Sequence, residues 1–145
     1  MHVPFLISLC GLPMSNATNT EKALLINRFW AALLNSNIAV TLPMLKSRLS
    51  TLLAIEQKFD AWKMLRETEA TFKLNPDEDF FALLLKQLSL TGDINSFDSM
   101  LAEIERRQLP VNMSMRASQI CCYLKSADKE AVEAVIQVRV SLRIY

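Results

Sequence analysis

The sequence predicts an all-α protein in which paired helices repeat as a solenoid, and three observations support this prediction. The chain of 145 residues is 51% hydrophobic and has only 2 glycines, a composition that favours long uninterrupted helices. Hydrophobic residues recur at helical spacing along most of its length. A near-repeat of about 35 residues is clearest over residues 78–112, and internal similarity at such a period is typical of helical repeat proteins.

This clearest copy contains two hydrophobic stripes separated by a turn. The turn holds Gly92, which can adopt the left-handed conformation that ends a helix, and Asp93, which can cap the next helix. Asp77 and Asn112 stand where the first helices of this unit and the next begin, and both are good capping residues. The stripes consist of Phe81, Leu84, Leu85 and Leu88 in the first helix, and Ile94, Phe97, Leu101 and Ile104 in the second.

Three more segments carry helical patterns. We predict one helix over residues 21–35 with Thr20 as its N-cap, and a helix pair within 42–77 that has Pro43 in its first turn. A third pair begins at Met113 and continues past a turn at Ala127. The inward positions are Ala23, Ile26, Trp30 and Leu33; Leu45, Leu49 and Leu52; Ala61, Leu65 and Thr68; Ile120 and Leu124; Val132, Val135 and Ile136.

The predicted organisation therefore has three parts. Residues 1–20 form an irregular segment or a remnant helix, residues 21–137 form the helical-repeat domain, and residues 138–145 form a tail. The repeat units are about 21–41, 42–77, 78–112 and an incomplete 113–137.

Composition excludes several kinds of protein. With 16 basic and 15 acidic residues, the net charge of +1 argues against nucleic-acid binding chiefly through bulk charge. His2 is the single histidine, so a Ser-His or Cys-His nucleophile pair and a zinc site lack ligands. Cys10, Cys121 and Cys122 are an odd set with two adjacent members, which indicates reduced thiols in a reducing compartment. We therefore expect no enzymatic activity, no metal and no cofactor.

The apolar segment 3–12 leaves the cellular location open. It is too short to span a bilayer, so we expect no membrane association. It is either a remnant helix or a signal peptide that lacks the usual preceding basic residues. The glycosylation triplets at Asn16 and Asn112 keep a small secreted helical protein as one alternative.

Residues 78–112 resemble a pentatricopeptide repeat. The resemblance extends loosely over residues 38–137, and it implies a right-handed solenoid of paired antiparallel helices. A fragment of a longer leucine-rich protein of this type is one form that it allows. Tetratricopeptide and other paired-helix solenoids are the alternatives. The features that carry the resemblance are Phe81, Leu84-Leu85, Leu88, Thr91-Gly92-Asp93, Phe97, Leu101, Ile104 and the closing Leu109 to Asn112.

The resemblance also implies a function. Pentatricopeptide repeat proteins typically bind single-stranded RNA in mitochondria or chloroplasts, one nucleotide per repeat, through the fifth and last side chains of each unit. Ala82 and Ala117 have no side-chain donor or acceptor with which to read a base, whereas Lys46 and Lys125 are suited to phosphate contact. The residues that would face RNA are Lys46, Asp77, Ala82, Asn112, Ala117 and Lys125.

We therefore expect a mitochondrial protein that binds single-stranded RNA and supports its stability, processing or translation. The main alternative is a helical-repeat scaffold, mitochondrial or cytoplasmic, that binds a protein and no RNA. Self-association is also open, because neither end carries the polar cap that terminal repeats usually have.

Several other residues have two interpretations. Arg48, like Lys46, either contacts phosphate or lies on a solvated helix face. The acidic run 77–79 either holds a cation or stabilises the positive end of a helix dipole, and the second is favoured. The aromatic side chains either stack on bases or pack between helices, and packing is favoured. They are Trp30, Trp62 and Phe72.

Overall fold

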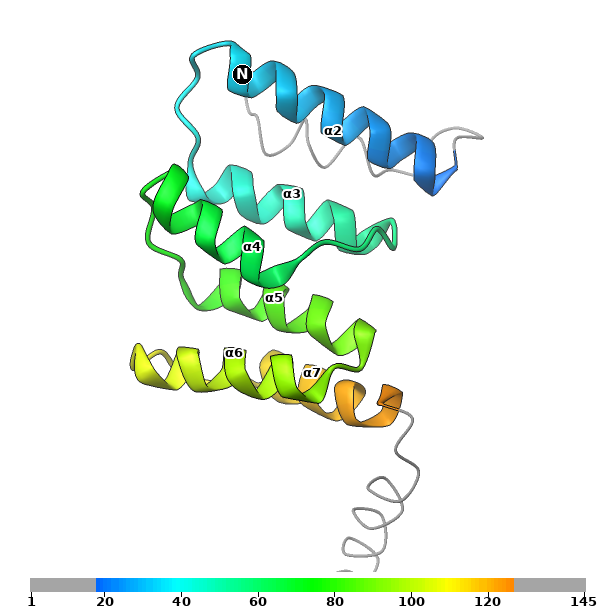
Figure 1. Ribbon diagram of the computed structural model, residues 1–145, viewed down its shortest axis with the longest axis vertical. Coiled ribbons are helices and arrows are strands. Elements are labelled where there is room, and N and C mark those ends of the chain that lie inside the picture. Colours follow the sequence, from blue (N-terminus) through cyan, green and yellow to red (C-terminus); the bar gives the residue numbers. More distant parts are fainter. Residues whose placement is uncertain (1–17, 127–145) are drawn as a thin grey trace, which may run out of the picture. The chain divides into compact units, whose positions relative to one another are not determined.

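The computed structural model describes residues 18–126, and within that range all regular elements are helices, with no strand (Figure 1). This confirms the predicted all-α class. The expectations for residues 1–17, for the turn at Ala127, for the helix containing Val132 and for the tail lie outside the described residues. The elements are α2 (Asn19–Asn35), α3 (Leu42–Ala54), α4 (Ala61–Arg66), the π-helical turn η1 (Glu67–Thr71), α5 (Glu78–Thr91), α6 (Ile94–Arg106) and α7 (Met113–Lys125).

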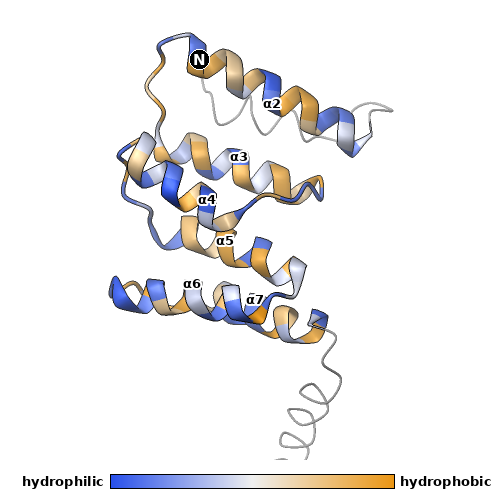
Figure 2. Cartoon of the chain, viewed as in Figure 1, coloured by the Kyte–Doolittle hydropathy of each residue, from blue (hydrophilic) through white to orange (hydrophobic). Residues whose placement is uncertain are grey.

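The chain divides into two compact units, Met1–Leu84 and Leu85–Tyr145, and the boundary falls inside α5. Hydrophobic and hydrophilic residues interleave along each described helix, the amphipathic pattern of helices with one buried face (Figure 2).

Helix α2 begins two residues earlier than the sequence pattern predicts. Its N-cap is Thr18, and Thr20 lies inside the first turn, so the prediction of Thr20 as the cap was wrong. The Thr18 hydroxyl accepts a hydrogen bond from the Glu21 backbone N–H at 3.2 Å, and the Glu21 carboxylate accepts one from the Thr18 N–H at 3.3 Å. This reciprocal capping box needs a three-residue spacing, which Thr18 has and Thr20 lacks.

In the first unit, α2 and α3 lie side by side (Figure 1) and share a hydrophobic cluster. Ala23 and Ile26 of α2 pack with Leu52 of α3 and with Ile55, and Phe59 covers the cluster. The predicted inward positions of both helices are buried, as are those of α4 and η1. Helical periodicity was therefore sufficient to identify these faces.

Helix α5 is buried more completely than its predicted stripe requires. All four stripe residues are buried, and Phe81, Leu84 and Leu85 have no exposed surface. Phe80 and Gln87, which the stripe omits, are also buried. The buried surface of α5 is therefore wider than the stripe read from the sequence.

The turn between α5 and α6 forms as predicted. Gly92 has φ +71°, in the left-handed region, and the Asp93 carboxylate accepts a hydrogen bond from the Ser96 backbone N–H at 3.1 Å. On α6, Phe97 is buried with the later stripe residues, whereas Ile94 is only partly buried.

The predicted buried face of α7 was wrong. Ile120 and Leu124, the predicted inward positions, are 46% and 60% exposed. The buried side chains are Met115, Ser118 and Cys122, which share a different face of the helix at spacings of three and four residues.

Candidate functional site

An open surface hollow of about 420 Å³ lies between α3 and the first half of α5. Both walls belong to the first compact unit, and each comes from residues spaced three or four apart on one helix face. Its lining combines four polar side chains with two apolar ones. Its lining consists of Lys46, Ser47 and Ser50 of α3, and Asp79, Ala82 and Leu83 of α5.

An ion pair joins α3 to the residue that precedes α5, at the edge of the hollow. The Lys46 ammonium donates to a carboxylate oxygen of Asp77 at 2.9 Å. The other Asp77 oxygen accepts the Phe80 backbone N–H at 2.9 Å, so the same side chain caps α5, as its position in the sequence predicts. Both carboxylate oxygens are therefore engaged by groups of this chain.

These contacts set the ionisation of Asp77. Partial burial raises the pKa of Asp77, but the hydrogen bonds from Lys46 and Phe80 and the Lys46 charge outweigh it and leave the pKa below its usual value. Asp77 is therefore a carboxylate at neutral pH. Because its side chain is 44% exposed, the ion pair contributes little to stability.

The charge balance beside the hollow is acidic. Lys46 is offset by Asp77, and α5 adds Glu78 and Asp79 in its first turn. These carboxylates suit the positive end of the helix dipole, which agrees with the favoured interpretation of the acidic run. An approaching phosphate would meet repulsion from them, whereas a cationic group would be attracted.

The structure brings together three of the six predicted RNA-facing residues. Lys46 and Ala82 line the hollow, and Asp77 binds Lys46 at its edge. The other three belong to the second unit. Asn112 caps α7 by accepting the Met115 backbone N–H at 2.9 Å, and Ala117 and Lys125 are exposed on α7.

The predicted RNA-facing set omitted the other lining residues, although Asp79 had been singled out as part of the acidic run. Ser50 is four residues after Lys46, and Leu83 is four residues after Asp79, so each shares a helix face with a residue already singled out. Helical spacing alone would have found both.

Arg48 does not belong to the hollow. Its guanidinium lies over the Trp30 ring, 4.7 Å from the ring centroid. Burial lowers the pKa of Arg48 and the charge of Glu67 opposes that shift. Two residues along a helix rotate a side chain by about 200°, which places Arg48 on a different face from Lys46. Arg48 is partly buried against Trp30, which does not fit the interpretation as a side chain on a solvated helix face.

The aromatic side chains follow the packing interpretation. Trp30 is 6% exposed and meets Phe72 edge to face, with ring centroids 6.3 Å apart. Trp62 is partly buried. A buried ring such as Trp30 cannot stack on a base without unpacking the first unit.

The cysteines of α7 differ in environment. Cys122 is buried and Cys121 is exposed, and both are free thiols. Burial and the nearby charges of Asp98 and Asp93 raise the pKa of Cys122, which makes it a poor nucleophile.

Within residues 18–126, no group of three or more His, Cys, Asp or Glu side chains is arranged to hold a metal ion. No helix in the same range is both long enough and apolar enough to cross a membrane.

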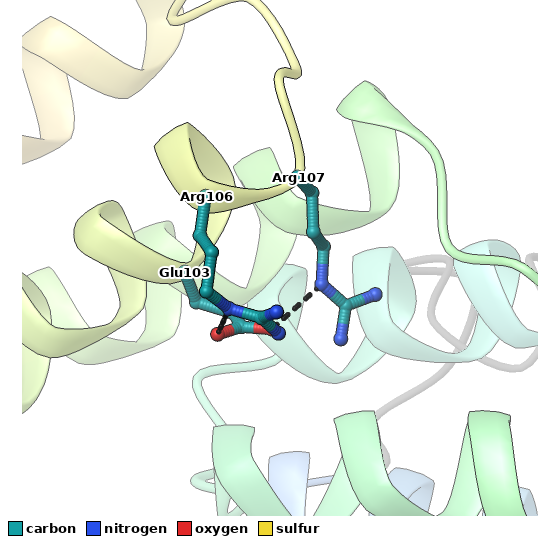
Figure 3. A network of polar contacts seen from close by, with 3 residues as sticks. All are labelled: Glu103, Arg106 and Arg107. Atoms are coloured by element: carbon teal, nitrogen blue, oxygen red, sulfur yellow. Dashed lines mark hydrogen bonds and ion pairs between the residues drawn. The ribbon is translucent and has the colours of Figure 1, made fainter.

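The end of α6 carries a compact network of charged side chains (Figure 3). The Glu103 carboxylate accepts hydrogen bonds from Arg106 Nε at 2.9 Å and from Arg107 Nε at 2.8 Å, and it also pairs with Arg106 Nη2. The hydrogen bonds from Arg106 and then Arg107 lower the pKa of Glu103 to about 2.

We predict a carboxyl titration of Glu103 with its midpoint near pH 2, measured by NMR of the labelled side chain. A lowered folded-state pKa stabilises the fold above the ordinary value of 4.5, and that contribution is lost as pH falls toward 2. Arg106→Ala should raise the midpoint, and Arg116→Ala on α7 serves as a control that should not. A wild-type midpoint near 4.5 would contradict the network.

No protein-family model matches this chain, and no curated protein matches it.

Proposed function

We propose that this chain is a right-handed solenoid of paired antiparallel helices that binds single-stranded RNA, with the hollow between α3 and α5 as a nucleotide contact. The observation that supports the proposal most directly is the ion pair between Lys46 and Asp77, at 2.9 Å. These are the fifth and last residues of predicted unit 42–77. Ala82, the fifth residue of the next unit, lines the same hollow. Residues selected by sequence position alone thus gather at one surface, as the resemblance to pentatricopeptide repeats implies.

The side chains of the hollow favour RNA contact that does not depend on the base sequence. Ala82 offers no hydrogen bond to a base edge, and both oxygens of Asp77 are already engaged. Lys46 retains further N–H groups for a phosphate, while Glu78 and Asp79 oppose one. Binding in this proposal is therefore weak, salt-dependent and tolerant of sequence.

The resemblance extends the proposal to cellular role. It implies a mitochondrial location, where RNA binding without catalysis would support transcript stability, processing or translation. The sequence is compatible with a binding role, since it has a single histidine and no glycine-rich phosphate loop.

A protein-binding scaffold is the second candidate, and the exposed face of α7 favours it. Met113, Ala117, Ile120 and Leu124 follow one another at spacings of four, three and four residues, which places them on one face of the helix. All four are exposed, Met113 by 83% and Leu124 by 60%. Apolar stripes on soluble proteins commonly mark contacts with another protein.

The proposal is tested by fluorescence anisotropy of a labelled single-stranded RNA at two salt concentrations. Lys46→Glu should weaken RNA binding. It should also reduce the salt dependence of the binding constant by the amount expected for the loss of about one phosphate contact. Asp77→Asn keeps an oxygen for capping α5 but removes the charge that competes for Lys46, so it should strengthen binding. Circular dichroism confirms that each variant is folded.

Lys63→Glu is the matched control, because it makes the same charge change at an exposed position on α4 outside the hollow. Equal weakening by both lysine variants would show that RNA responds to total charge and not to the hollow. A folded chain that binds no RNA at low salt would contradict the proposal and favour the scaffold.

A further inference from the structure

A second polar site lies inside the first unit, where Arg48 meets the π-helical turn. A cavity of about 10 Å³ is lined by Arg48, Glu67 and Thr68 together with four apolar side chains of α3, α4 and α5. This volume corresponds to one water molecule.

One buried donor beside this cavity lacks a partner. The Nε–H of Arg48 is shielded from solvent and forms no hydrogen bond to any group in residues 18–126. The Trp30 ring covers the guanidinium from α2. Leaving a buried donor unsatisfied costs roughly 1–3 kcal/mol, more for a charged group, so native structures normally supply a partner.

The cavity also offers acceptors. Thr68 is 1% exposed and its hydroxyl donates to the Met64 carbonyl at 2.8 Å. That bond uses the only hydrogen of the hydroxyl, so the oxygen can act only as an acceptor toward the cavity. Glu67 contributes carboxylate oxygens and raises the pKa of Arg48 through its charge.

We propose that this cavity binds one structural water molecule. The water accepts the Arg48 Nε–H and donates its two hydrogens to Thr68 Oγ1 and the Glu67 carboxylate. Three polar partners are the usual number for a buried water. An anion is disfavoured because Glu67 lines the cavity, and an apolar ligand is disfavoured because it would leave the Arg48 Nε–H unsatisfied.

The water would connect polar groups at the contact between three segments. Arg48 belongs to α3, Trp30 covers it from α2, and Glu67 and Thr68 open η1. An ordered water bridges polar groups nearly as well as a direct hydrogen bond. The water therefore supplies the hydrogen bond that the Arg48 Nε–H lacks, without a direct contact between Arg48 and Glu67.

The test is NMR of the full ¹⁵N-labelled chain, with cross-relaxation measured between water and arginine Nε–H protons. We expect a dipolar cross-peak between water and the Arg48 Hε, with the sign given by a water that tumbles with the protein. Arg66 is exposed on α4. Its Hε should show only a water cross-peak of the opposite sign, which arises from proton exchange. A wild-type Arg48 Hε without a dipolar water peak, or one bonded directly to Glu67, would overturn the proposal.

A variant pair tests the assigned acceptor. Thr68→Val preserves side-chain shape and removes the hydroxyl, so the water peak should be lost, whereas Thr68→Ser keeps the hydroxyl and should retain it. Retention of the peak in folded Thr68→Val would remove Thr68 from the site. If Thr68→Val does not fold, the wild-type spectrum and Thr68→Ser still decide whether the water is bound.

Discussion

Leu85→Ala is expected to lower the free energy of unfolding by about 2–5 kcal/mol. Leu85 lies in α5 and has no exposed surface. Truncation removes buried methyl groups and leaves a cavity that close-packed neighbours fill only in part. Alanine has the higher helix propensity, so the loss comes from packing and not from the backbone of α5. Urea denaturation followed by circular dichroism measures the change.

Leu90→Ala is the matched control for this prediction. It makes the same truncation in the same helix at a side chain that is 40% exposed. A half-exposed leucine leaves no closed cavity, so its cost should be well below that of Leu85→Ala. Equal costs for the two variants, or a cost below about 0.5 kcal/mol for Leu85→Ala, would show that the helix phasing is wrong.

Gly92→Ala is expected to destabilise the chain through two separate effects. The left-handed φ of +71° costs an alanine roughly 1 kcal/mol. In addition, an added Cβ would lie 2.9 Å from the Lys125 backbone carbonyl oxygen. A backbone atom cannot move aside as a flexible side chain can, so this overpacking adds roughly 1–3 kcal/mol. Thermal or urea unfolding measures the sum.

Asn37→Ala separates the two effects. Asn37 also has a left-handed conformation, with φ 60°, but it is exposed in the turn after α2. Its substitution therefore carries backbone strain without the collision, and it should cost less than Gly92→Ala. If the two variants are equally destabilised, the close approach of Gly92 to the Lys125 carbonyl makes no contribution to the loss of stability in Gly92→Ala.

Sequence reasoning was most accurate where a structural rule depends on neighbours along the chain. Helix faces such as those of α2 and α6 follow from the period of 3.6 residues, and the caps at Asp77, Asp93 and Asn112 follow from side-chain chemistry at a helix start. It failed at Thr20, where the reciprocal spacing to Glu21 decided the cap. These are short-range effects, so even the failure could have been avoided from sequence.

The candidate site was predictable only in part. Lys46, Asp77 and Ala82 were selected through a resemblance, but the direct ion pair between Lys46 and Asp77 was not expected. Those two residues are 31 positions apart. Their distance depends on how α3 packs against the start of α5, which no local pattern specifies.

By itself, the sequence determined that the described chain is helical and which faces α2, α3, α5 and α6 bury, because these depend on periodicity within a few residues. It was wrong about the start of α2 and about the buried face of α7. The tertiary structure decided which charged side chains contact other groups of the chain. It paired Lys46 with Asp77, placed Arg48 over Trp30, and formed a small cavity lined by Arg48 and Thr68. The physical reason is that charge and burial depend on distances between helices, and those distances are fixed only when the hydrophobic faces pack together.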